Sequence, residues 1–530
     1  MRVPILERQA WGSHGCGSPE FPTTASPARG PAGAVEDPIL SAVATDYETV
    51  IGLEVHCQLM TKSKMFCGCS ADYSGAGPNT HVCPVCMGMP GVLPVINEQA
   101  IEYIAMTGLA LNCEIAEFSK FDRKNYHYPD QMKGYQISQY DLPVCLNGWL
   151  EVEVDGQRTR LGITRVHMEE DTARLLHRVD AATGEGYSLV DVNRSGTPLM
   201  EIVSEPDMRS AAEAREYLVR LRQILRYIGV SDANMEEGNF RCDANVSLRV
   251  RGTEPFGAKV EVKNMNSFRA VHDAIVFEQK RQAEALDAGG TIAQETRGWV
   301  DEHGVTVSQR SKEDADDYRY FPEPDLPPLR LGRDYVAKLR ANLPELPEAR
   351  KERFIALGLS EYEAATLTEF RDRADYFEEV TRAIDLGAER SAKLAANWVL
   401  GEVGRWVNAH AGSLADASMA PERLAGLVRM ADDGKITGAV AKEVFEQMAA
   451  TGKTAAEIVE ASGLSQISDS DELLAIVHQV IAGNERAVAD YRAGKEASIK
   501  RLIGEVMRET RGRANPAVVQ SLLEQRLRAK

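Results

Sequence analysis

Five segments in the first half of the chain alternate between hydrophobic and polar residues, which is the pattern of half-buried β-strands. In Ile51–Leu59, the odd-numbered positions are hydrophobic and the even-numbered positions are glycine or polar. The alternation returns in four further segments: Ile163–Asp171, Leu199–Glu205, Arg241–Val250 and Lys259–Lys263. Such strands commonly form an antiparallel sheet that has one face in the core and the other in water. The first half is therefore predicted to be rich in β-structure.

One clear helix interrupts these strands. Ser210 and Glu213 have the spacing of a capping box, and hydrophobic residues then recur at helical spacing at Leu218, Leu221, Ile224, Leu225 and Ile228. The segment Tyr320–Pro328 can be neither a continuous helix nor an internal strand, because its prolines lack N–H donors. Beyond it the composition shifts to Ala, Leu, Glu, Arg and Lys, which favours helices, with a further break near Gly463–Ser470.

These patterns predict an α+β protein in four parts. Residues 1–44 are rich in Gly, Pro, Ala and Ser and lack hydrophobic periodicity, so we expect a disordered N-terminal extension. A targeting peptide is the alternative, although the acidic residues in this segment disfavour it. Residues 45–335 should form a β-rich antiparallel domain, residues 336–462 an all-helical domain and residues 463–530 a small helical tail domain.

Length and charge narrow the possible functions. A chain of 530 residues is too long for one hydrophobic core. Since no run of about 18 apolar residues occurs, we expect no membrane partner. The net charge of −18 argues against nucleic acid, but residues 491–530 hold ten Lys and Arg against four Asp and Glu. This end carries +6 and the preceding 490 residues carry −24, so the tail is either a phosphate-contacting surface or merely a solvated basic face.

Four of the nine cysteines form a CxC pair and a CxxC pair at the two ends of a loop that contains Gly and Pro. They are Cys67, Cys69, Cys83 and Cys86. Two closely spaced thiolate pairs suit a closed, tetrahedral Zn²⁺ site, which would be structural because it keeps no open position. Disulfides and free thiols are the alternatives. The odd cysteine count and the lack of an N-terminal apolar export segment favour a reducing, cytoplasmic location.

The polar faces of the predicted strands mix His, Asn, Asp, Arg and Glu, whereas a merely solvated face tends to carry Lys, Glu and Thr. Glu54 and His56 lie on one face of one strand, roughly 6.5–7 Å apart. Both could bind one ion if neighbouring strands contribute further oxygen atoms. Such a set suits Mg²⁺ or Mn²⁺, and these ions serve phosphoryl transfer. The alternative is a sheet face that is simply solvated.

Nine segments closely resemble, in order along the chain, the GatB family, which comprises the B subunits of tRNA-dependent amidotransferases. The segments are ETVIGLEVHCQL (48–59), KFDRKNYHYPDQMKGYQISQYDLP (120–143), RVHMEED (165–171), LVDVNRSGTPLMEIVSEPD (189–207), MEEGNFRCDANVSLR (235–249), YRYFPEPDLPPL (318–329), NWVLGEV (397–403), GLSQISD (463–469) and RANPAVVQSLL (513–523). The resemblance covers residues 46–530 and does not extend over the N-terminal extension.

The resemblance implies a fold and an activity. The fold is a β-rich cradle domain with a zinc-binding loop, followed by a helical domain and a helical YqeY-like tail that contacts tRNA. The activity is that of a carbon–nitrogen ligase in a heterotrimer with GatA and GatC. The side-chain carboxylate of misacylated Glu-tRNA(Gln) or Asp-tRNA(Asn) is phosphorylated by ATP with Mg²⁺. It is then amidated with ammonia that GatA releases from glutamine. No DNA partner is expected.

The resemblance also assigns roles to particular residues. The positions that match the family's magnesium-binding pocket are Glu54, His56, Glu169, Asp243 and Glu261. These five and Lys263 are the candidate catalytic residues. Arg194 and Arg241 are candidates for contacting phosphate or carboxylate groups, and for these two and Lys263 a structural ion pair is the alternative. Some family members lack the four cysteines, so the zinc is not expected to take part in the chemistry.

Two other functions remain open on the residue patterns. One is a non-catalytic RNA-binding scaffold whose carboxylates are merely solvated. The other is a metal-dependent phosphotransferase that acts without partner subunits.

Overall fold

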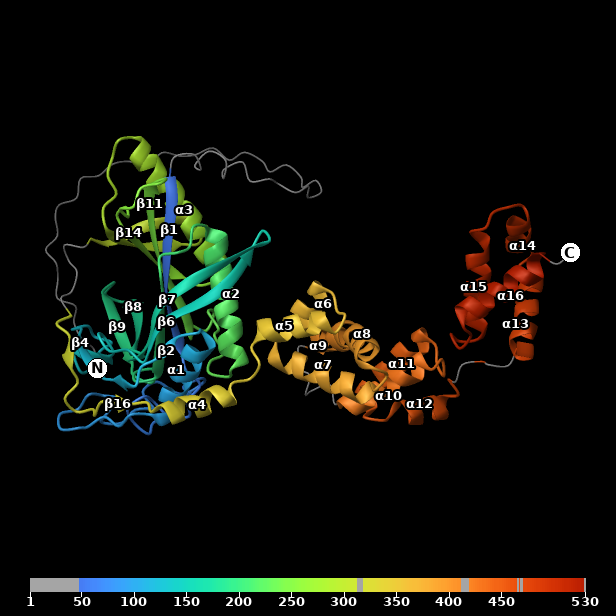
Figure 1. Cartoon of the computed structure of the whole chain (residues 1–530), viewed down its shortest axis with the longest axis horizontal. Coiled ribbons are helices and arrows are strands. Elements are labelled where there is room, and N and C mark those ends of the chain that lie inside the picture. Colours follow the sequence, from blue (N-terminus) through green and yellow to red (C-terminus); the bar gives the residue numbers. More distant parts are fainter. Residues whose placement is uncertain (1–46, 312–317, 411–418, 465–466, 468–469, 529–530) are drawn as a thin grey trace. The chain divides into compact units, whose positions relative to one another are not determined.

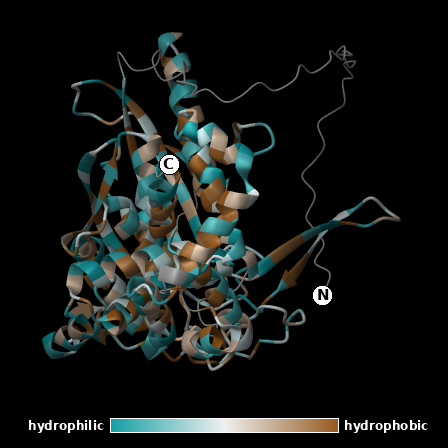
Figure 2. Ribbon diagram, turned by 90° about the vertical axis from the view of Figure 1, so that its right-hand side faces the viewer, coloured by the Kyte–Doolittle hydropathy of each residue, from teal (hydrophilic) through white to brown (hydrophobic). Residues whose placement is uncertain are grey.

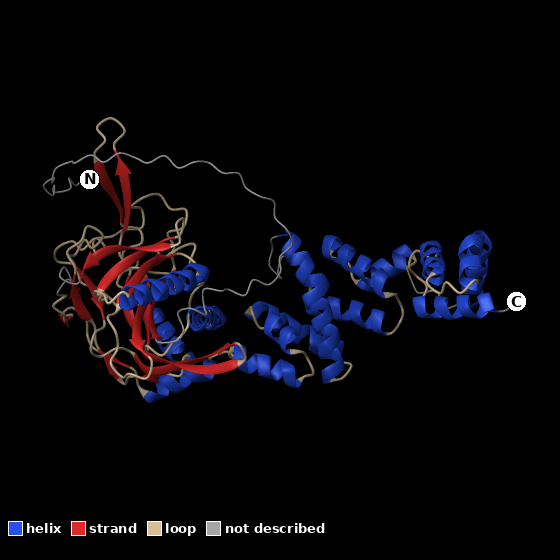
Figure 3. Cartoon of the chain, turned by 90° about the horizontal axis from the view of Figure 1, so that it is seen from above, coloured by secondary structure: helices blue, strands red, loops and turns tan. Residues whose placement is uncertain are grey.

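The structure is a computed structural model that describes residues 47–311, 318–410, 419–464, 467 and 470–528. It divides into two compact units, Met1–Pro344 and Glu345–Lys530. All strands of the described residues belong to the first unit, and the described part of the second unit is helical (Figure 3). The expected N-terminal extension, residues 1–44, lies outside the described residues. The expected boundary at residue 335 falls inside helix α4 (Arg333–Asn342), and the units divide at Pro344.

A nine-stranded sheet forms the centre of the first unit (Figure 1). Its strands, in spatial order, are β14 (Val305–Ser311), β13 (Glu295–Val300), β12 (Val260–Met265), β11 (Phe240–Val250), β1 (Tyr47–Gln58), β10 (Pro198–Ser204), β7 (Gln157–Glu170), β6 (Cys145–Val154) and β2 (Glu114–Ile115). The five strands expected from the hydrophobic alternation are β1, β7, β10, β11 and β12, and all five are confirmed. The expected antiparallel pairing holds along the sheet except at one pair, since β12 and β13 run parallel.

The parallel pair has a local cause. Parallel neighbours need a crossover connection, which is usually a helix. Helix α3 (Phe268–Asp287) makes this crossover between β12 and β13. It begins at Ser267, whose hydroxyl accepts a hydrogen bond from the backbone N–H of Ala270 at 3.0 Å. This helix was not expected from the sequence, and neither was α1 (Glu98–Ala110), although both have N-terminal caps.

The hydrophobic face of the sheet is covered by helices. Leu53, Val55 and Cys57 of β1 are all buried on that face. Helix α3 packs on the adjacent β11, where the side-chain amide of Gln282 donates to the carbonyl of Val246 at 3.3 Å. The expected helix is confirmed as α2 (Ala211–Tyr227) with its complete capping box, and it packs against α3 and β6.

The smaller sheets of the first unit lie outside the large one. Strands β15 (Phe321–Pro322), β4 (Asp122–Asn125) and β5 (Tyr135–Ser138) form a three-stranded sheet. Strand β16 (Leu329–Arg330) pairs with β3 (Phe118–Ser119), and β8 (Arg174–Val179) pairs with β9 (Gly186–Asp191).

The second unit is built from short amphipathic helices (Figure 2). They are α5 (Pro347–Ala356), α6 (Glu361–Leu367), α7 (Arg371–Ile384), α8 (Ala388–Trp398), a π-helical turn (Val399–Val403), α9 (Gly404–His410), α10 (Pro421–Asp432), α11 (Gly438–Thr451), α12 (Ala455–Ser462), α13 (Ser470–Gly483), α14 (Glu485–Arg492), α15 (Ser498–Glu509) and α16 (Pro516–Arg528). Helices α13 to α16 share a hydrophobic core of their own. The expected division at residues 462 and 463 agrees with this core and stays a prediction, because residues 345–530 form one compact unit. Within the described residues, no helix is both long and apolar enough to cross a bilayer.

A buried carboxylate fastens α3 to the end of the sheet. Glu278 is 0% exposed. Its carboxylate lies 2.7 Å from Arg281 Nη2 and 3.2 Å from Arg297 Nε of β13, and it accepts a hydrogen bond from the Thr306 hydroxyl of β14. Burial alone would raise the pKa of Glu278, but these hydrogen bonds outweigh burial and hold the pKa below its ordinary value of 4.5.

Replacing Glu278 by Gln should therefore destabilise the first unit by about 3 kcal/mol at neutral pH, because partly buried Arg281 loses its counter-charge and Arg297 keeps only its pair with Glu295. A group whose pKa is lowered by folding stabilises the fold above its unfolded pKa, so the difference from wild type should shrink as the pH falls below about 4.5. Urea denaturation, with hydrogen exchange followed in α3 and β13, would measure both effects. The control is Lys280→Ala on the same helix, which removes an exposed pair and should cost less than about 0.5 kcal/mol. An equal loss in the two variants would contradict this role of Glu278.

Candidate active site

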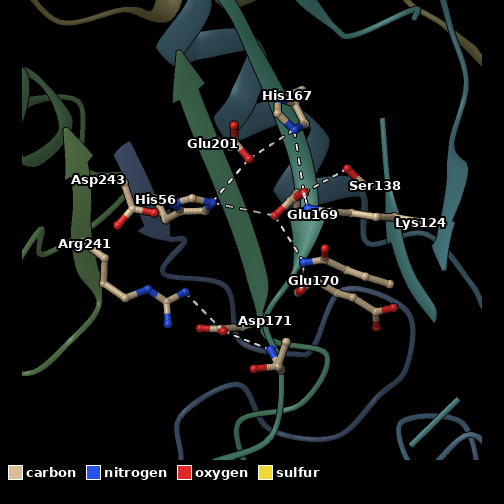
Figure 4. A network of polar contacts seen from close by, with 12 residues as sticks. His56, Lys124, Ser138, His167, Glu169, Glu170, Asp171, Glu201, Arg241 and Asp243 are labelled. Atoms are coloured by element: carbon tan, nitrogen blue, oxygen red, sulfur yellow. Dashed lines mark hydrogen bonds and ion pairs between the residues drawn. The ribbon is translucent and has the colours of Figure 1, made fainter. Parts of the chain in front are cut away.

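One row of polar side chains crosses the four central strands of the large sheet. His56 of β1 is directly opposite Arg241 of β11 and Glu201 of β10, and Glu201 is in turn opposite His167 of β7. Directly paired residues point to the same face of a sheet, so all four side chains lie opposite the hydrophobic face. Glu169 lies two residues beyond His167 on the same face of β7 and joins the row (Figure 4).

The two histidines and the two carboxylates are close enough to interact. His56 Nε2 lies 3.2 Å from Glu201 Oε2 and 3.9 Å from Glu169 Oε2. His167 Nε2 lies 3.5 Å from Glu201 Oε2 and 3.7 Å from Glu169 Oε1. One ligand atom each from His56, Glu169 and Glu201 lies within 4.8 Å of the other two. Two carboxylates and an imidazole in this arrangement fit a single divalent cation such as Mg²⁺ or Mn²⁺.

The small sheet covers this row on the side away from the helices. Glu169 is 2% exposed. It accepts hydrogen bonds from the Ser138 hydroxyl at 2.9 Å and from the Gln136 side-chain amide at 3.1 Å, both on β5, and Lys124 Nζ of β4 lies 3.7 Å away (Figure 4). The polar face of β7 is therefore enclosed, which contradicts the alternative of a solvated face at this strand.

Mutual charge keeps the carboxylates ionised. Burial alone would raise the pKa of Glu169, but Lys124 and the two histidines outweigh burial and hold the pKa well below its usual range. For Glu201, burial is likewise outweighed by His167 and His56, which lower its pKa to about 2. Burial would lower the pKa of His56, yet Glu201 and Glu169 raise it above its ordinary value. At neutral pH the site therefore presents two charged carboxylates.

The two candidate arginines meet at Asp171, which is buried just beyond the end of β7. Arg241 Nη2 lies 3.1 Å from Asp171 Oδ1, and the Gln58 side-chain amide donates to Asp171 Oδ2 at 2.6 Å. Arg194 Nε lies 3.7 Å from Asp171 Oδ1 and donates to the carbonyl of Thr172 at 2.9 Å. Arg194 is thus engaged with its own loop, whereas Arg241 is 36% exposed and stands next to His56, where it can reach a bound anion.

The five expected magnesium ligands do not form one close group. His56 and Glu169 are in the group just described, but Glu54, Asp243 and Glu261 are not. Lys263 Nζ lies 2.7 Å from Asp243 and 3.1 Å from Glu261, so it forms an ion pair with each carboxylate. Glu54 accepts a hydrogen bond from the side-chain amide of Asn245 at 2.9 Å. Lys263 is therefore an ion-pair partner in this structure, and its pKa is raised because the two carboxylates outweigh burial.

Sequence reasoning missed Glu201, His167 and Lys124 as site residues. Glu201 belongs to one of the predicted strands, but its importance depends on β10 lying between β1 and β7. Lys124 reaches the site only because β4 and β5 fold over the sheet, and its segment has no alternation that would place it there.

The zinc prediction is supported by the positions of the four thiols. The Sγ atoms of Cys67, Cys69, Cys83 and Cys86 all lie within 4.8 Å of one another. The distance between Cys83 Sγ and Cys86 Sγ is 3.9 Å, close to the roughly 3.8 Å edge of a tetrahedron with Zn–S bonds of about 2.3 Å, and far from the about 2.05 Å of a disulfide. A hydrogen bond with Cys67 lowers the pKa of Cys86 to about 5. These residues fit zinc, and its presence stays a prediction.

Comparisons with known proteins identify the class to which this fold and site belong. Residues 49–337 match the GatB/GatE catalytic domain, and residues 375–527 match the GatB domain. The chain is 58% identical over 489 residues to the B subunit of the aspartyl/glutamyl-tRNA(Asn/Gln) amidotransferase of Dehalococcoides mccartyi (strain CBDB1), and the match covers 91% of this chain and 99% of that protein.

Two further relatives carry the same name as the first. Identity is 56% over 483 residues to the corresponding B subunit of Thermomicrobium roseum and 53% over 483 residues to that of Carboxydothermus hydrogenoformans, each covering 91% of this chain and 99% of the relative. This chain belongs to the GatB family of tRNA amidotransferase B subunits, which confirms the resemblance seen in its sequence motifs.

Replacing Cys67 by Ser should lower bound zinc from about one equivalent per chain to below about half an equivalent, because a three-thiolate site binds the metal less tightly. Metal analysis of the purified protein measures the content, and limited proteolysis of residues 59–97 reports whether the loop loosens. Cys57→Ala is the control, since Cys57 is a buried thiol outside the group of four. Wild-type protein without zinc would contradict the prediction.

Proposed function

We propose that this chain is the B subunit of a heterotrimeric, glutamine-dependent tRNA amidotransferase that it forms with GatA and GatC. It would convert Glu-tRNA(Gln), Asp-tRNA(Asn) or both into the correctly charged Gln-tRNA(Gln) and Asn-tRNA(Asn). The observation that carries the proposal is the enclosed cluster of His56, Glu169 and Glu201, flanked by Lys124 and Arg241. The names of the relatives support the substrate class and the existence of partner subunits.

The reaction needs two steps at one acyl group. In the first, an oxygen of the side-chain carboxylate attacks the γ-phosphorus of ATP, the bond to the ADP oxygen breaks, and an acyl phosphate forms. In the second, ammonia attacks the acyl carbon, a C–N bond forms, and phosphate leaves as the C–O bond breaks while a proton is released. The first step brings two anions together, and the second develops negative charge on the acyl oxygen and on the leaving phosphate, so fixed positive charge is the main requirement of the site.

The residues around the cluster meet this requirement. Lys124 lies under the Tyr318 ring, with Nζ 5.0 Å from the ring centroid, and its pKa is raised because Glu169 outweighs burial. It therefore stays protonated and can hold a phosphate or carboxylate oxygen. Arg241 offers a second cation in the same row, and Asp171 fixes its orientation. Magnesium would be held by His56, Glu169 and Glu201, and when bound it neutralises phosphate oxygens.

The proposed source of the ammonia is a partner subunit. Cys57 is the cysteine nearest to the cluster in sequence, but it lies on the hydrophobic face of β1 and is buried. Burial raises its pKa to about 12, so the thiol remains protonated and is a poor nucleophile. This supports a separate glutaminase subunit as the nitrogen source.

Replacing Glu169 by Gln should reduce ATP-dependent amidation at least about 100-fold in a trimer reconstituted with GatA and GatC, because the neutral amide binds the cation more weakly and cannot form an ion pair with Lys124. The affinity for tRNA should stay within twofold. The control is Glu205→Gln, an exposed acidic residue beyond the end of β10 that pairs with Thr164. Wild-type amidation by Glu169→Gln would instead favour the non-catalytic RNA-binding scaffold.

Deleting residues 463–530 should weaken tRNA binding at least about tenfold and leave glutaminase activity intact. Helix α15 exposes Lys500, Arg501 and Arg508 over a core that α13 to α16 share, so the deletion removes a basic surface together with its own core. The double substitution Lys500→Glu/Arg501→Glu should have the same direction of effect and reduce the salt dependence of binding. Unchanged affinity in both variants would contradict a tRNA-contacting tail.

A further inference from the structure

An aromatic stack leads from the surface to the candidate active site. The rings of Tyr140 and Tyr320 are parallel to within 10°, with centroids 4.3 Å apart. Tyr318 meets Tyr320 in an edge-to-face contact at 6.1 Å, and Lys124 lies between Tyr318 and Glu169. Tyr320 is only partly exposed, but Tyr140 at the outer end is 56% exposed. The stack thus begins in solvent and ends at the charged cluster.

The backbone that carries the inner tyrosines is strained. Arg319 has a φ of +40°, which is unfavourable for a residue with a side chain. Asn125 of β4 holds this turn: its backbone N–H donates to the carbonyl of Tyr318 at 2.9 Å, and its side-chain amide donates to the carbonyls of Tyr318 and Arg319 at 3.0 and 2.9 Å. Such strain persists only where the surroundings impose it, and it is concentrated at functional sites.

The outer tyrosine is also fixed in place. The backbone N–H of Tyr140 donates to Asp122 Oδ2 at 3.1 Å, and Asp122 is itself buried. Lys120 pairs with Asp122 and with Asp141, the residue after Tyr140. A stack that served only to fill the core would have its outer ring buried. Here one flat face of Tyr140 rests on Tyr320, and more than half of the residue remains open to solvent.

We propose that Tyr140 and Tyr320 form a stacking platform for the adenine ring of an adenosine-bearing substrate, with Tyr140 as the contact ring. The inference rests on the proposed function, in which two substrates carry adenine: ATP, and the 3′-terminal adenosine of the aminoacylated tRNA. Proteins commonly hold unpaired bases by stacking them on aromatic side chains. With the base on Tyr140, the reactive end of the substrate would extend past Tyr320 towards Lys124 and Glu169.

The test uses Tyr140→Ala in the reconstituted trimer. We measure KM and direct binding for ATP and, separately, for misacylated tRNA, each with the other substrate saturating. The substitution should raise one of the two KM values about tenfold and weaken binding of the same substrate to match, and the substrate that responds identifies the source of the adenine. Tyr140→Phe, which keeps the ring, should lose little of that affinity.

Tyr362→Ala is the control, since Tyr362 is an exposed tyrosine (78%) on helix α6 of the second unit. The inference is wrong if Tyr140→Ala leaves both KM values and both affinities within twofold of wild type. It is also wrong if Tyr140→Ala lowers the melting temperature and kcat without changing either KM. A wild-type trimer that does not amidate under these conditions would contradict the proposed function, whereas a working trimer with an unaffected Tyr140→Ala would contradict only the platform.

Discussion

The antiparallel register of β11, β1, β10 and β7 is the constraint on which the site depends. It places Arg241, His56, Glu201 and His167 in one row across four strands. Because side chains alternate between the two faces, a slip of one residue in any of these pairings would move charged groups into the hydrophobic core. The buried face of β1, with Leu53, Val55 and Cys57, therefore fixes the positions of the charges on the other face. Core packing and site geometry are two results of the same register.

The second requirement is that the carboxylates of the polar row stay ionised although the small sheet shields them from water. Enclosure by β4 and β5 removes Glu169 from water, and that alone would favour its protonated form. Lys124, on the covering strand, supplies the opposing charge that keeps the carboxylate ionised. The small sheet of β15, β4 and β5 thus both shields Glu169 from water and supplies, through Lys124, the positive charge that keeps Glu169 ionised. Ionised carboxylates beside fixed cations in a partly dry site are what phosphoryl transfer between anionic substrates requires.

The spacing of residues along the sequence predicted much of this architecture. The site residues that it did not predict were missed for a common reason, which is that their roles depend on contacts between segments far apart in the sequence. The five alternating strands, helix α2 and the grouping of four cysteines follow from spacing alone, since each depends on neighbours in sequence. Glu201 and Lys124 were missed because their roles depend on which strands are adjacent and on a hairpin folding over the sheet. Helix α3 was missed although Ser267 caps it, because its mixed polar and hydrophobic residues give a weaker pattern than that of α2. The parallel β12–β13 pair follows directly from that missed crossover.

The acidic residues on the polar face of the sheet form two groups with different roles. One contains Asp243 and Glu261, and the other contains Glu169 and Glu201 together with His56. Asp243 and Glu261 share one ammonium, that of Lys263, which lies between the two carboxylates at 2.7 and 3.1 Å. At the second group, Lys124 lies on the covering strand 3.7 Å from Glu169, and Glu201 faces the two histidines. A cation can bind between His56, Glu169 and Glu201 without displacing an ammonium, whereas the position between Asp243 and Glu261 is already taken by Lys263. The position of the lysine ammonium, more than the number of acidic residues, distinguishes the group that can bind a metal from the group whose carboxylates are held together by an ion pair.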